Sequence, residues 1–248
     1  MAYAWRWLRS LFFSVQMYFI MFVLGLCYTP LAVLNREYAL HGTRIYCRWV
    51  RWTASWMIGL KSEVRGHVPT EEVIIAAKHQ SFFDIILLIS ALPRPRFIMK
   101  AELRFAPILG WFAMRIGCVP VKRGQRVVAM KKMVLDVAGA TATPGQLVVY
   151  PQGTRVAAGA YLPYKPGVSV LRGHTGRTVV PAATNVGVFW PRRGIYRKPG
   201  LAVMEFMEPI PAPENGGPSK AAFLEYLEGR VEAKSGRLME EAGFMVTD

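Results

Sequence analysis

The sequence predicts an α/β fold in which a mixed, largely parallel central sheet is flanked by helices and preceded by an N-terminal two-helix membrane-docking hairpin. Three observations lead to this prediction. Short apolar runs typical of strands alternate with helical patterns along residues 61–248. Residues 1–60 hold a long uncharged run and a tryptophan-rich helical face. The 248 residues, 52% of them hydrophobic, suffice for one substantial domain after the hairpin.

The first helix is predicted from the run between Leu11 and Leu34, which contains no charged side chain. A run of this length can cross a hydrocarbon core of about 30 Å. It lacks the small-x-small cleavage site of a secretory signal peptide. Basic residues flank it on both sides, so they do not set an orientation. Spanning the membrane and embedding in one leaflet both remain open.

The second helix, over residues 38–60, carries Trp49, Trp52 and Trp56 on one face, with Ile45. An adjacent stripe is formed by Arg44, Arg48 and Arg51. Tryptophan rings bordered by guanidinium groups suit the headgroup level of a bilayer. The alternative is that these rings pack on the domain core.

The overall charge is strongly basic, with 31 Lys and Arg against 16 Asp and Glu, a formal net charge of +15. Such a chain is expected to meet a membrane surface, a phosphate-bearing substrate or a nucleic acid. No segment resembles a recognition helix, an RNP block or a zinc finger, so we expect no nucleic-acid partner. The three cysteines lack C-x-x-C spacing, which predicts neither a disulfide framework nor a zinc site and fits a reducing compartment.

The rest of the chain reads as alternating strands and helices. Strands are predicted over 61–65, 73–77, 96–100, 118–121, 146–150, 178–185 and 201–207. Helices are predicted over about 81–92, 102–116, 125–139, 167–173 and 219–243. Pro107 is expected to kink or break its helix. Pro181 favours the start of a strand or an edge strand over a central one.

A histidine and an aspartate lie where the strand over 73–77 gives way to a helix. Ser81 to Asp84 has the form of a capping box, with Asp in place of the usual Glu or Gln. This geometry lets the side chains of His79 and Asp84 meet, so that the carboxylate fixes one imidazole nitrogen and leaves the other as a base. Taken alone, the spacing fits equally well a helix cap beside an ordinary core histidine.

Two further strand ends carry basic residues or glycine, namely 122–124 and 153–155. Ligands of α/β sheets bind where strands end and loops begin. If these ends adjoin His79, a base lies beside clustered positive charge, which predicts a hydroxyl-bearing phosphate substrate. Gly153 allows close approach of a ligand, and its N–H or that of Thr154 is a candidate oxyanion donor.

The strand ends at His79, Lys122 and Gly153 belong to a series of short motifs over roughly residues 60–210. In their order and spacing, these motifs resemble those of the glycerolipid acyltransferases of the PlsC type, the 1-acylglycerol-3-phosphate acyltransferases. Residues 79–84 are similar to the second to seventh positions of the family's N-H-x4-D block, and 100–103 to its K-x-E-L block. Residues 117–123 and 150–155 are similar to its G-x-I-x-x-x-R and F-P-E-G-T-R blocks. Residues 165–167 and 180–183 are similar to the K-x-G and V-P blocks that follow.

The resemblance implies an enzyme that moves an acyl chain from acyl-CoA or acyl-carrier protein to the free hydroxyl of lysophosphatidate, giving phosphatidate. His79 is then the base and Asp84 the group that orients it. The implied phosphate-binding residues are Arg123, Arg155, Lys100 and Lys122. The implied oxyanion loop comprises Gln152, Gly153 and Thr154. No metal or cofactor is implied beyond the thioester co-substrate. The expected location is the cytoplasmic face of the cell (inner) membrane.

Two departures from the family pattern leave the acceptor open. Lys78 replaces the Asn before the histidine and is expected to add positive charge beside it. Gln152 replaces the Glu of the third block and keeps its shape without its charge. Another lyso-lipid, such as lyso-ornithine lipid, is therefore an alternative acceptor. A non-catalytic lipid-binding protein would explain the hairpin but not the ordered blocks.

Overall fold

A computed structural model describes residues 2–122, 145–212 and 215–244. It contains a seven-stranded sheet in the order β1-β7-β6-β2-β5-β3-β4. The strands are β1 (Leu60–Arg65), β2 (Ile74–Ala77), β3 (Pro95–Lys100), β4 (Val119–Val121), β5 (Gln146–Val149), β6 (Val179–Thr184) and β7 (Gly200–Phe206). The helices are α1 (Ala2–Leu34), α2 (Glu37–Met57), α3 (Phe83–Ala91), the 3₁₀ helix η1 (Ala101–Phe105), α4 (Leu109–Arg115), α6 (Gly167–Thr175), α7 (Val186–Phe189) and α8 (Lys220–Glu241).

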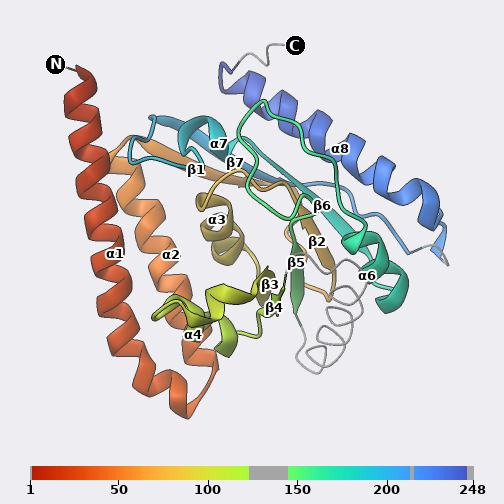
Figure 1. The fold of residues 1–248 in the computed structure, drawn as a ribbon, viewed down its shortest axis with the longest axis horizontal. Helices are drawn as coiled ribbons and strands as arrows, with labels where there is room; N and C mark the ends of the chain where they lie inside the picture. Colours follow the sequence, from red (N-terminus) through yellow and green to blue (C-terminus); the bar gives the residue numbers. More distant parts are fainter. Residues whose placement is uncertain (1, 123–144, 213–214, 245–248) are drawn as a thin grey trace.

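The helices form a layer on each side of the sheet. Figure 1 shows α3, α2 and then α1 on one side, and α6 and α8 on the other. The side chains of β2 explain this layering, because Ile75 and Ala77 enter the α2 and α3 core whereas Ile74 and Ala76 enter the α6 and α8 core. All four are fully buried, as expected for a parallel strand covered on both faces.

The sheet confirms the predicted mixed, largely parallel arrangement. Every strand pair is parallel except β6 with β7, so β1 and β7 run against the other five strands. Pairing joins the two ends of the sequence, since Leu60 lies opposite Gly200 and Arg65 opposite Glu205. The order of the strands brings the carboxyl ends of β2, β5, β3 and β4 to one edge.

The expectation for Pro181 is wrong, because β6 is an interior strand between β7 and β2. The antiparallel ladder with β7 covers only Ala182 to Thr184. Pro181 lies beyond that ladder, where its carbonyl accepts from the N–H of Met207, the residue after β7 ends. The missing N–H of proline therefore falls where the neighbouring strand has stopped, and the central position is tolerated.

The helix predicted over 102–116 is broken at Pro107 into η1 and α4, as its proline indicated. The predicted helix over 125–139 lies outside the described residues. The short helix α7 was not predicted. It spans only Val186–Phe189, which is too short for a helical period to appear in the sequence.

The predicted N-terminal hairpin is formed by α1 and α2, which pack along each other. Among the described residues one helix, Tyr3–Leu34, is long and apolar enough to cross a membrane. The outer face of α1 is apolar and exposed. It includes Trp5, Phe12, Phe19 and Leu26, each more than half exposed and spaced by seven residues.

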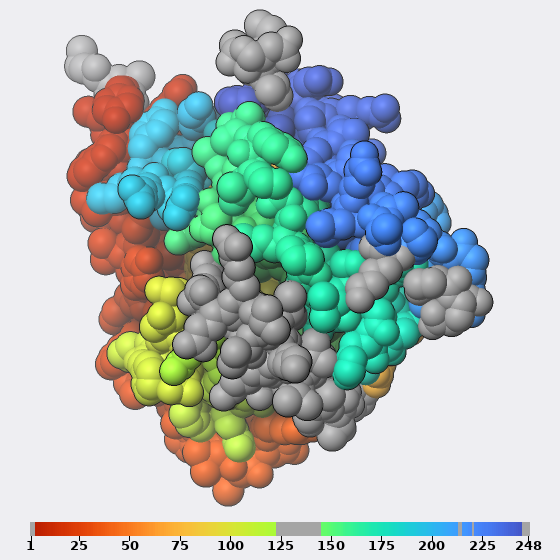
Figure 2. Space-filling view, turned by 45° about the vertical axis from the view of Figure 1, so that its right-hand side comes forward, coloured from red at the N-terminus to blue at the C-terminus, as the bar shows by residue number. Residues whose placement is uncertain are grey.

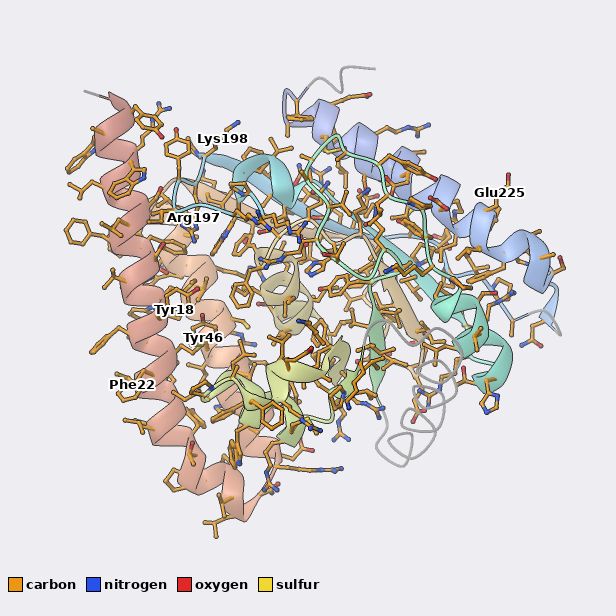
Figure 3. The ribbon with its side chains drawn as sticks, in the orientation of Figure 1. Tyr18, Phe22, Tyr46, Arg197, Lys198 and Glu225 are labelled. Carbon is orange, nitrogen blue, oxygen red and sulfur yellow. The ribbon has the colours of Figure 1, made fainter. Side chains whose placement is uncertain are left out.

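Both ends of α1 are tied to the rest of the protein. Near its start, the guanidinium of Arg197 donates to Ser14 Oγ at 2.9 Å and covers the Trp190 ring at 4.2 Å. Figure 3 shows Arg197 beside α1. Near its end, Arg115 Nε donates to the carbonyl of Ala32 at 3.1 Å. The helix is thereby held along the side of the domain.

The tryptophan face of α2 is exposed, which favours the interfacial interpretation over packing on the core. Trp52 and Trp56 are each 57% exposed. The neighbouring arginine stripe differs from the prediction. Arg44 donates to the carbonyl of Leu92 at 2.9 Å, and Arg51 donates to Ser62 Oγ at 2.9 Å. These two guanidinium groups therefore fasten α2 to the domain rather than pointing as a stripe toward solvent.

Candidate active site

Four parallel strand ends form the edge where the sequence placed its candidate residues. His79 follows β2 and Gly153 follows β5, and these strands are neighbours. Lys100 ends β3 and Lys122 follows β4, at the outer edge of the sheet. With strands about 4.8 Å apart, roughly 14 Å separate β2 from β4. The sheet thus brings the His79 and Gly153 segments together, with the β4 segment farther along the same edge.

His79 and Asp84 meet as predicted. Nδ1 of His79 lies 3.1 Å from Oδ2 of Asp84, whose side chain is fully buried, while 12% of the His79 side chain is exposed. The same Oδ2 accepts from the backbone N–H groups of Gln80 at 2.6 Å and Ser81 at 2.7 Å. The carboxylate therefore fixes the imidazole through Nδ1, which leaves Nε2 as the nitrogen that can take a proton.

The capping box is only partly as predicted. The Asp84 half is present, because the carboxylate accepts from the N–H of Ser81. The Ser81 hydroxyl accepts from the N–H of Phe83 at 3.3 Å, one residue before the position that a capping box uses. Helix α3 begins at Phe83, with Phe82 as its N-cap residue.

Tyr150, which sequence reasoning did not single out as a site residue, forms a wall of the site. Its ring stacks on the imidazole of His79, with centroids 3.8 Å apart and planes 15° apart. Burial, with the nearby Asp84 charge, raises the pKa of the Tyr150 phenol well above its ordinary value, so the ring stays neutral. An aromatic residue directly before Pro151 in the third block was the available signal.

The loop after β5 turns sharply at Gly153, where φ is +71°. Such a left-handed backbone favours glycine. The N–H of Gly153 donates to the carbonyl of Tyr150 at 2.8 Å, so the turn itself uses this donor. Of the two predicted oxyanion donors, Thr154 is the better candidate. The loop then passes His79, whose carbonyl accepts from the N–H of Val156 at 2.8 Å.

The comparisons with known proteins agree with this geometry. A family model described as Acyltransferase matches residues 61–185, half of the chain. The chain belongs to the Acyltransferase family. The matched region of this acyltransferase begins in β1 and ends just after β6, so it contains His79, Asp84 and the turn at Gly153.

Several curated relatives are acyltransferases by name. A Pseudomonas aeruginosa 1-acyl-sn-glycerol-3-phosphate acyltransferase is 27% identical over 198 residues, covering 79% of this chain and 76% of that protein. The human 1-acyl-sn-glycerol-3-phosphate acyltransferase beta is 28% identical over 199 residues, covering 75% and 71%. A lyso-ornithine lipid O-acyltransferase of Pseudomonas aeruginosa is 39% identical over 79 residues, covering 31% and 30%.

A solved structure shares the fold of this acyltransferase. The crystal structure of the 1-acyl-sn-glycerophosphate (LPA) acyltransferase PlsC from Thermotoga maritima superposes with a TM-score of 0.75 at 23% identity. The match covers 94% of this chain and 98% of that one, so it includes the N-terminal hairpin as well as the sheet. At this identity the likeness shows the fold.

The predicted phosphate-binding residues of the acyltransferase differ in their exposure and in their contacts. Arg155 is partly exposed and donates to the carbonyl of Arg192 at 3.4 Å. Lys100 and Lys122 are exposed, and the Lys100 ammonium lies 3.5 Å from Glu102. Arg123 lies outside the described residues.

Lys165 is a basic residue that the predicted site omitted, although its block was part of the resemblance. A Cβ added to Gly153 would lie 3.1 Å from the Lys165 ammonium. Lys165 therefore projects over the turn that follows β5. Figure 2 shows the loop after β5 in green, between the 190–199 segment and α8. Its ammonium is a further candidate for holding a phosphate at this edge.

The two departures from the family pattern have separate structural explanations. Lys78 does not add charge beside His79, because successive strand residues point to opposite faces. Its buried ammonium pairs instead with Glu232 of α8. Gln152 is 1% exposed, and its Nε2 donates to the carbonyl of Leu162 at 3.2 Å, a bond that a carboxylate cannot make.

Within the described ranges, no group of three or more His, Cys, Asp or Glu side chains is arranged to hold a metal ion.

Proposed function

We propose that this acyltransferase moves an acyl chain from a thioester to the free sn-2 hydroxyl of lysophosphatidate, forming phosphatidate. The observation that carries the proposal is the His79–Asp84 pair, held at a strand end next to the basic loop after β5. Names of relatives that cover most of this chain support the choice of acceptor. Acyl-CoA and acyl-carrier protein are both candidate donors.

In the proposed reaction, Nε2 of His79 removes the proton of the acceptor hydroxyl while its oxygen attacks the thioester carbonyl. A C–O bond forms, and the carbonyl oxygen becomes an oxyanion, whose stabilisation we assign to the N–H of Thr154. The C–S bond then breaks, and the thiolate takes the proton from the imidazolium. Asp84 keeps the ring oriented and stabilises its charged form, so no acyl-enzyme is needed.

The phosphate of the acceptor is assigned to the basic side chains along the same edge. Arg155 and Lys165 come from the loop beside the dyad, and Lys100 ends the adjacent strand β3. Lys122 and Arg123 follow β4 and are assigned on the resemblance of their block to the family. Guanidinium and ammonium groups bind phosphate oxygens strongly when water is partly excluded.

We propose that the hairpin lies along one leaflet rather than crossing the bilayer. Contacts at both ends of α1 hold it against the domain, while its outer apolar face is uncovered. An amphipathic arrangement of this kind suits the membrane interface. We assign the protein to the cytoplasmic face of the cell membrane, because its free cysteines, Cys27, Cys47 and Cys118, suit a reducing compartment.

The test is an acyl-transfer assay with purified protein, lysophosphatidate in mixed vesicles, and each of the two donor types. Replacing His79 by Ala is expected to lower turnover by roughly a hundredfold or more, since general base catalysis contributes about 10²–10⁴. His174→Ala, at an exposed position on α6, is the matched control and should retain activity. Full activity of His79→Ala with intact membrane binding would contradict the mechanism.

Lyso-ornithine lipid is the second candidate acceptor, favoured by the local 39% identity to an enzyme named for it. The same assay with this acceptor separates the two. A higher kcat/KM for lyso-ornithine lipid than for lysophosphatidate would replace the proposed substrate while keeping the reaction class.

A further inference from the structure

A polar cluster built around a buried lysine lies on the α8 side of the sheet and has no part in the proposed proton transfers. Lys78 is 1% exposed, and its ammonium pairs with the carboxylate of Glu232. The other oxygen of that carboxylate accepts from the Tyr164 hydroxyl at 3.0 Å. Three separate elements therefore meet at one carboxylate: the end of β2, helix α8 and the loop that returns from the turn at Gly153.

Each end of this cluster is next in sequence to a residue of the site. Lys78 precedes His79, and its N–H donates to the carbonyl of Ala182 at 2.9 Å. Tyr164 precedes Lys165, whose N–H donates to the carbonyl of Pro151 at 3.0 Å. The cluster thus joins the strand end that carries the base to the segment that carries the ammonium over Gly153.

The loop over residues 151–166 is fixed from both sides of the sheet. On the His79 side, the loop is anchored by the hydrogen bond from the N–H of Val156 to the His79 carbonyl. On the α8 side, Tyr164 is 6% exposed and packs in the core with Leu227 and Val231. Burial, together with Glu232, raises the pKa of the Tyr164 phenol far above its ordinary value, so the hydroxyl keeps its proton and remains a donor.

The Lys78 ammonium and the Glu232 carboxylate hold each other in a fixed geometry because a buried charge without its partner is strongly unfavourable. The carboxylate of Glu232, whose side chain is 25% exposed, is therefore held by Lys78 as an acceptor for Tyr164. Errors of about 1 Å in the placement of a binding group can reduce turnover on the order of a hundredfold. Anchoring of the loop by this cluster can therefore affect acyl transfer, even though the cluster lies on the opposite face of the sheet from His79.

We propose that Lys78, Glu232 and Tyr164 are positioning residues, which set the 151–166 loop, and with it Lys165 and Arg155, relative to His79. The inference rests on the proposed function, because it assigns the loop to the phosphate of the acceptor. Lys78, which stands where the family pattern has Asn, would then act on the α8 face of the sheet through Glu232, away from His79.

The decisive experiment compares Tyr164→Phe with Tyr161→Phe in the full chain. Tyr164→Phe removes one hydroxyl and keeps the packed ring. Tyr161 lies in the same loop, is 69% exposed and bonds Glu228 at the surface, so Tyr161→Phe is the control for losing a solvent-exposed phenol. Assayed well below the thermal midpoint, Tyr164→Phe is expected to raise the KM for the lyso-acceptor on the order of tenfold. The KM of Tyr161→Phe should be unchanged.

A purely structural role would lower the thermal midpoint of Tyr164→Phe and leave its KM and kcat at the wild-type values, which would overturn the inference. Wild-type protein that transfers no acyl chain to any lyso-acceptor would instead overturn the proposed function. The two failures are therefore distinguishable from one set of assays.

A second comparison tests the charge pair. Glu232→Gln leaves the Lys78 ammonium without its counter-charge, and the double variant Lys78→Met with Glu232→Gln removes both charges while keeping an oxygen that can accept from Tyr164. We expect the double variant to recover thermal stability and acceptor KM relative to Glu232→Gln. Glu225→Gln is the control, since Glu225 projects from α8 away from the sheet in Figure 3. A stable double variant with wild-type KM alongside an unaffected Tyr164→Phe would contradict the positioning role.

Discussion

At the scale of single residues, one oxygen of Asp84 has two tasks. It accepts from two backbone N–H groups that shape the start of α3, and it holds the imidazole of His79. The same oxygen therefore makes both kinds of contact that the sequence suggested, the bonds at the start of the helix and the contact with the imidazole. A substitution at Asp84 will disturb both the start of α3 and the orientation of His79. Gln152 acts on the loop through its bond to the Leu162 carbonyl, so a substitution there tests the loop separately.

Replacing Gln152 by Glu, the residue found in the family pattern, is expected to weaken this particular chain. The change removes the bond from Nε2 to the Leu162 carbonyl and sets a buried carboxylate near that carbonyl oxygen. The loss of a buried hydrogen bond costs about 1–3 kcal/mol. Thermal unfolding should show a lower midpoint, and acyl transfer at a fixed temperature should fall. An increase in both would indicate that the loop accepts the family residue without cost.

The contact between His79 and Asp84 could be predicted because a short spacing across a strand-to-helix junction leaves few alternatives. The direction of Lys78 was misread, although the alternation of Ile75, Ala77 and His79 against Ile74, Ala76 and Lys78 was present in the sequence. Its partner Glu232 could not have been found, because only the packing of α8 on the sheet brings the two together. Tyr150 was missed because an aromatic residue after a strand has many other uses.

At the scale of elements, α2 combines two kinds of surface. Arg44 and Arg51 bind the domain, and the tryptophan face remains uncovered. The prediction that this face would be exposed rested on its neighbouring arginines, yet two of those guanidinium groups point elsewhere. What identified the face was the helical spacing of the rings themselves.

The double variant Trp52→Ser with Trp56→Ser is expected to reduce binding to lipid vesicles by roughly tenfold or more, because each buried aromatic ring contributes about 1.5–3 kcal/mol. Both rings are more than half exposed, so the thermal midpoint should change little. Tyr226→Ser removes an exposed ring from α8 and serves as the control. Vesicle co-sedimentation measures the effect, and equal binding of all three proteins would place the membrane contact elsewhere.

The succession of strands and helices was predictable, but the order of strands in the sheet was not. Nothing local indicates that β7 inserts between β1 and β6 and reverses direction. The prediction that Pro181 lies at a strand start or on an edge strand was wrong for the same reason. A proline is tolerated in this central strand because β7 ends beside it, which the sequence does not reveal. Local patterns fix the type of an element, whereas its neighbours follow from the topology of the whole chain.

At the scale of the whole molecule, a net charge of +15 accompanies a long apolar helix face. Both features favour an anionic membrane, but they respond differently to salt. Coulombic attraction is screened over about 10 Å at 0.1 M salt and about 3 Å at 1 M, whereas apolar burial is not weakened.

Binding to vesicles that contain anionic phospholipid is therefore expected to fall as salt rises and to level off at a residual value. Binding to zwitterionic vesicles should match that residual value at every salt concentration. Sedimentation across a salt series checks both. Complete loss of binding at high salt would show that the apolar face of α1 does not enter the bilayer.

The pairing of β1 with β7 has a consequence for biosynthesis. The strand that follows the hairpin has its hydrogen-bonding partner near residue 200, so that edge of the sheet cannot close until most of the chain has been translated. The hairpin leaves the ribosome before the strands of the sheet, and α1 and α2 can pack on each other through local contacts. The nascent protein can therefore settle on a membrane while its catalytic domain is still open, and the last strand to be made completes the sheet there.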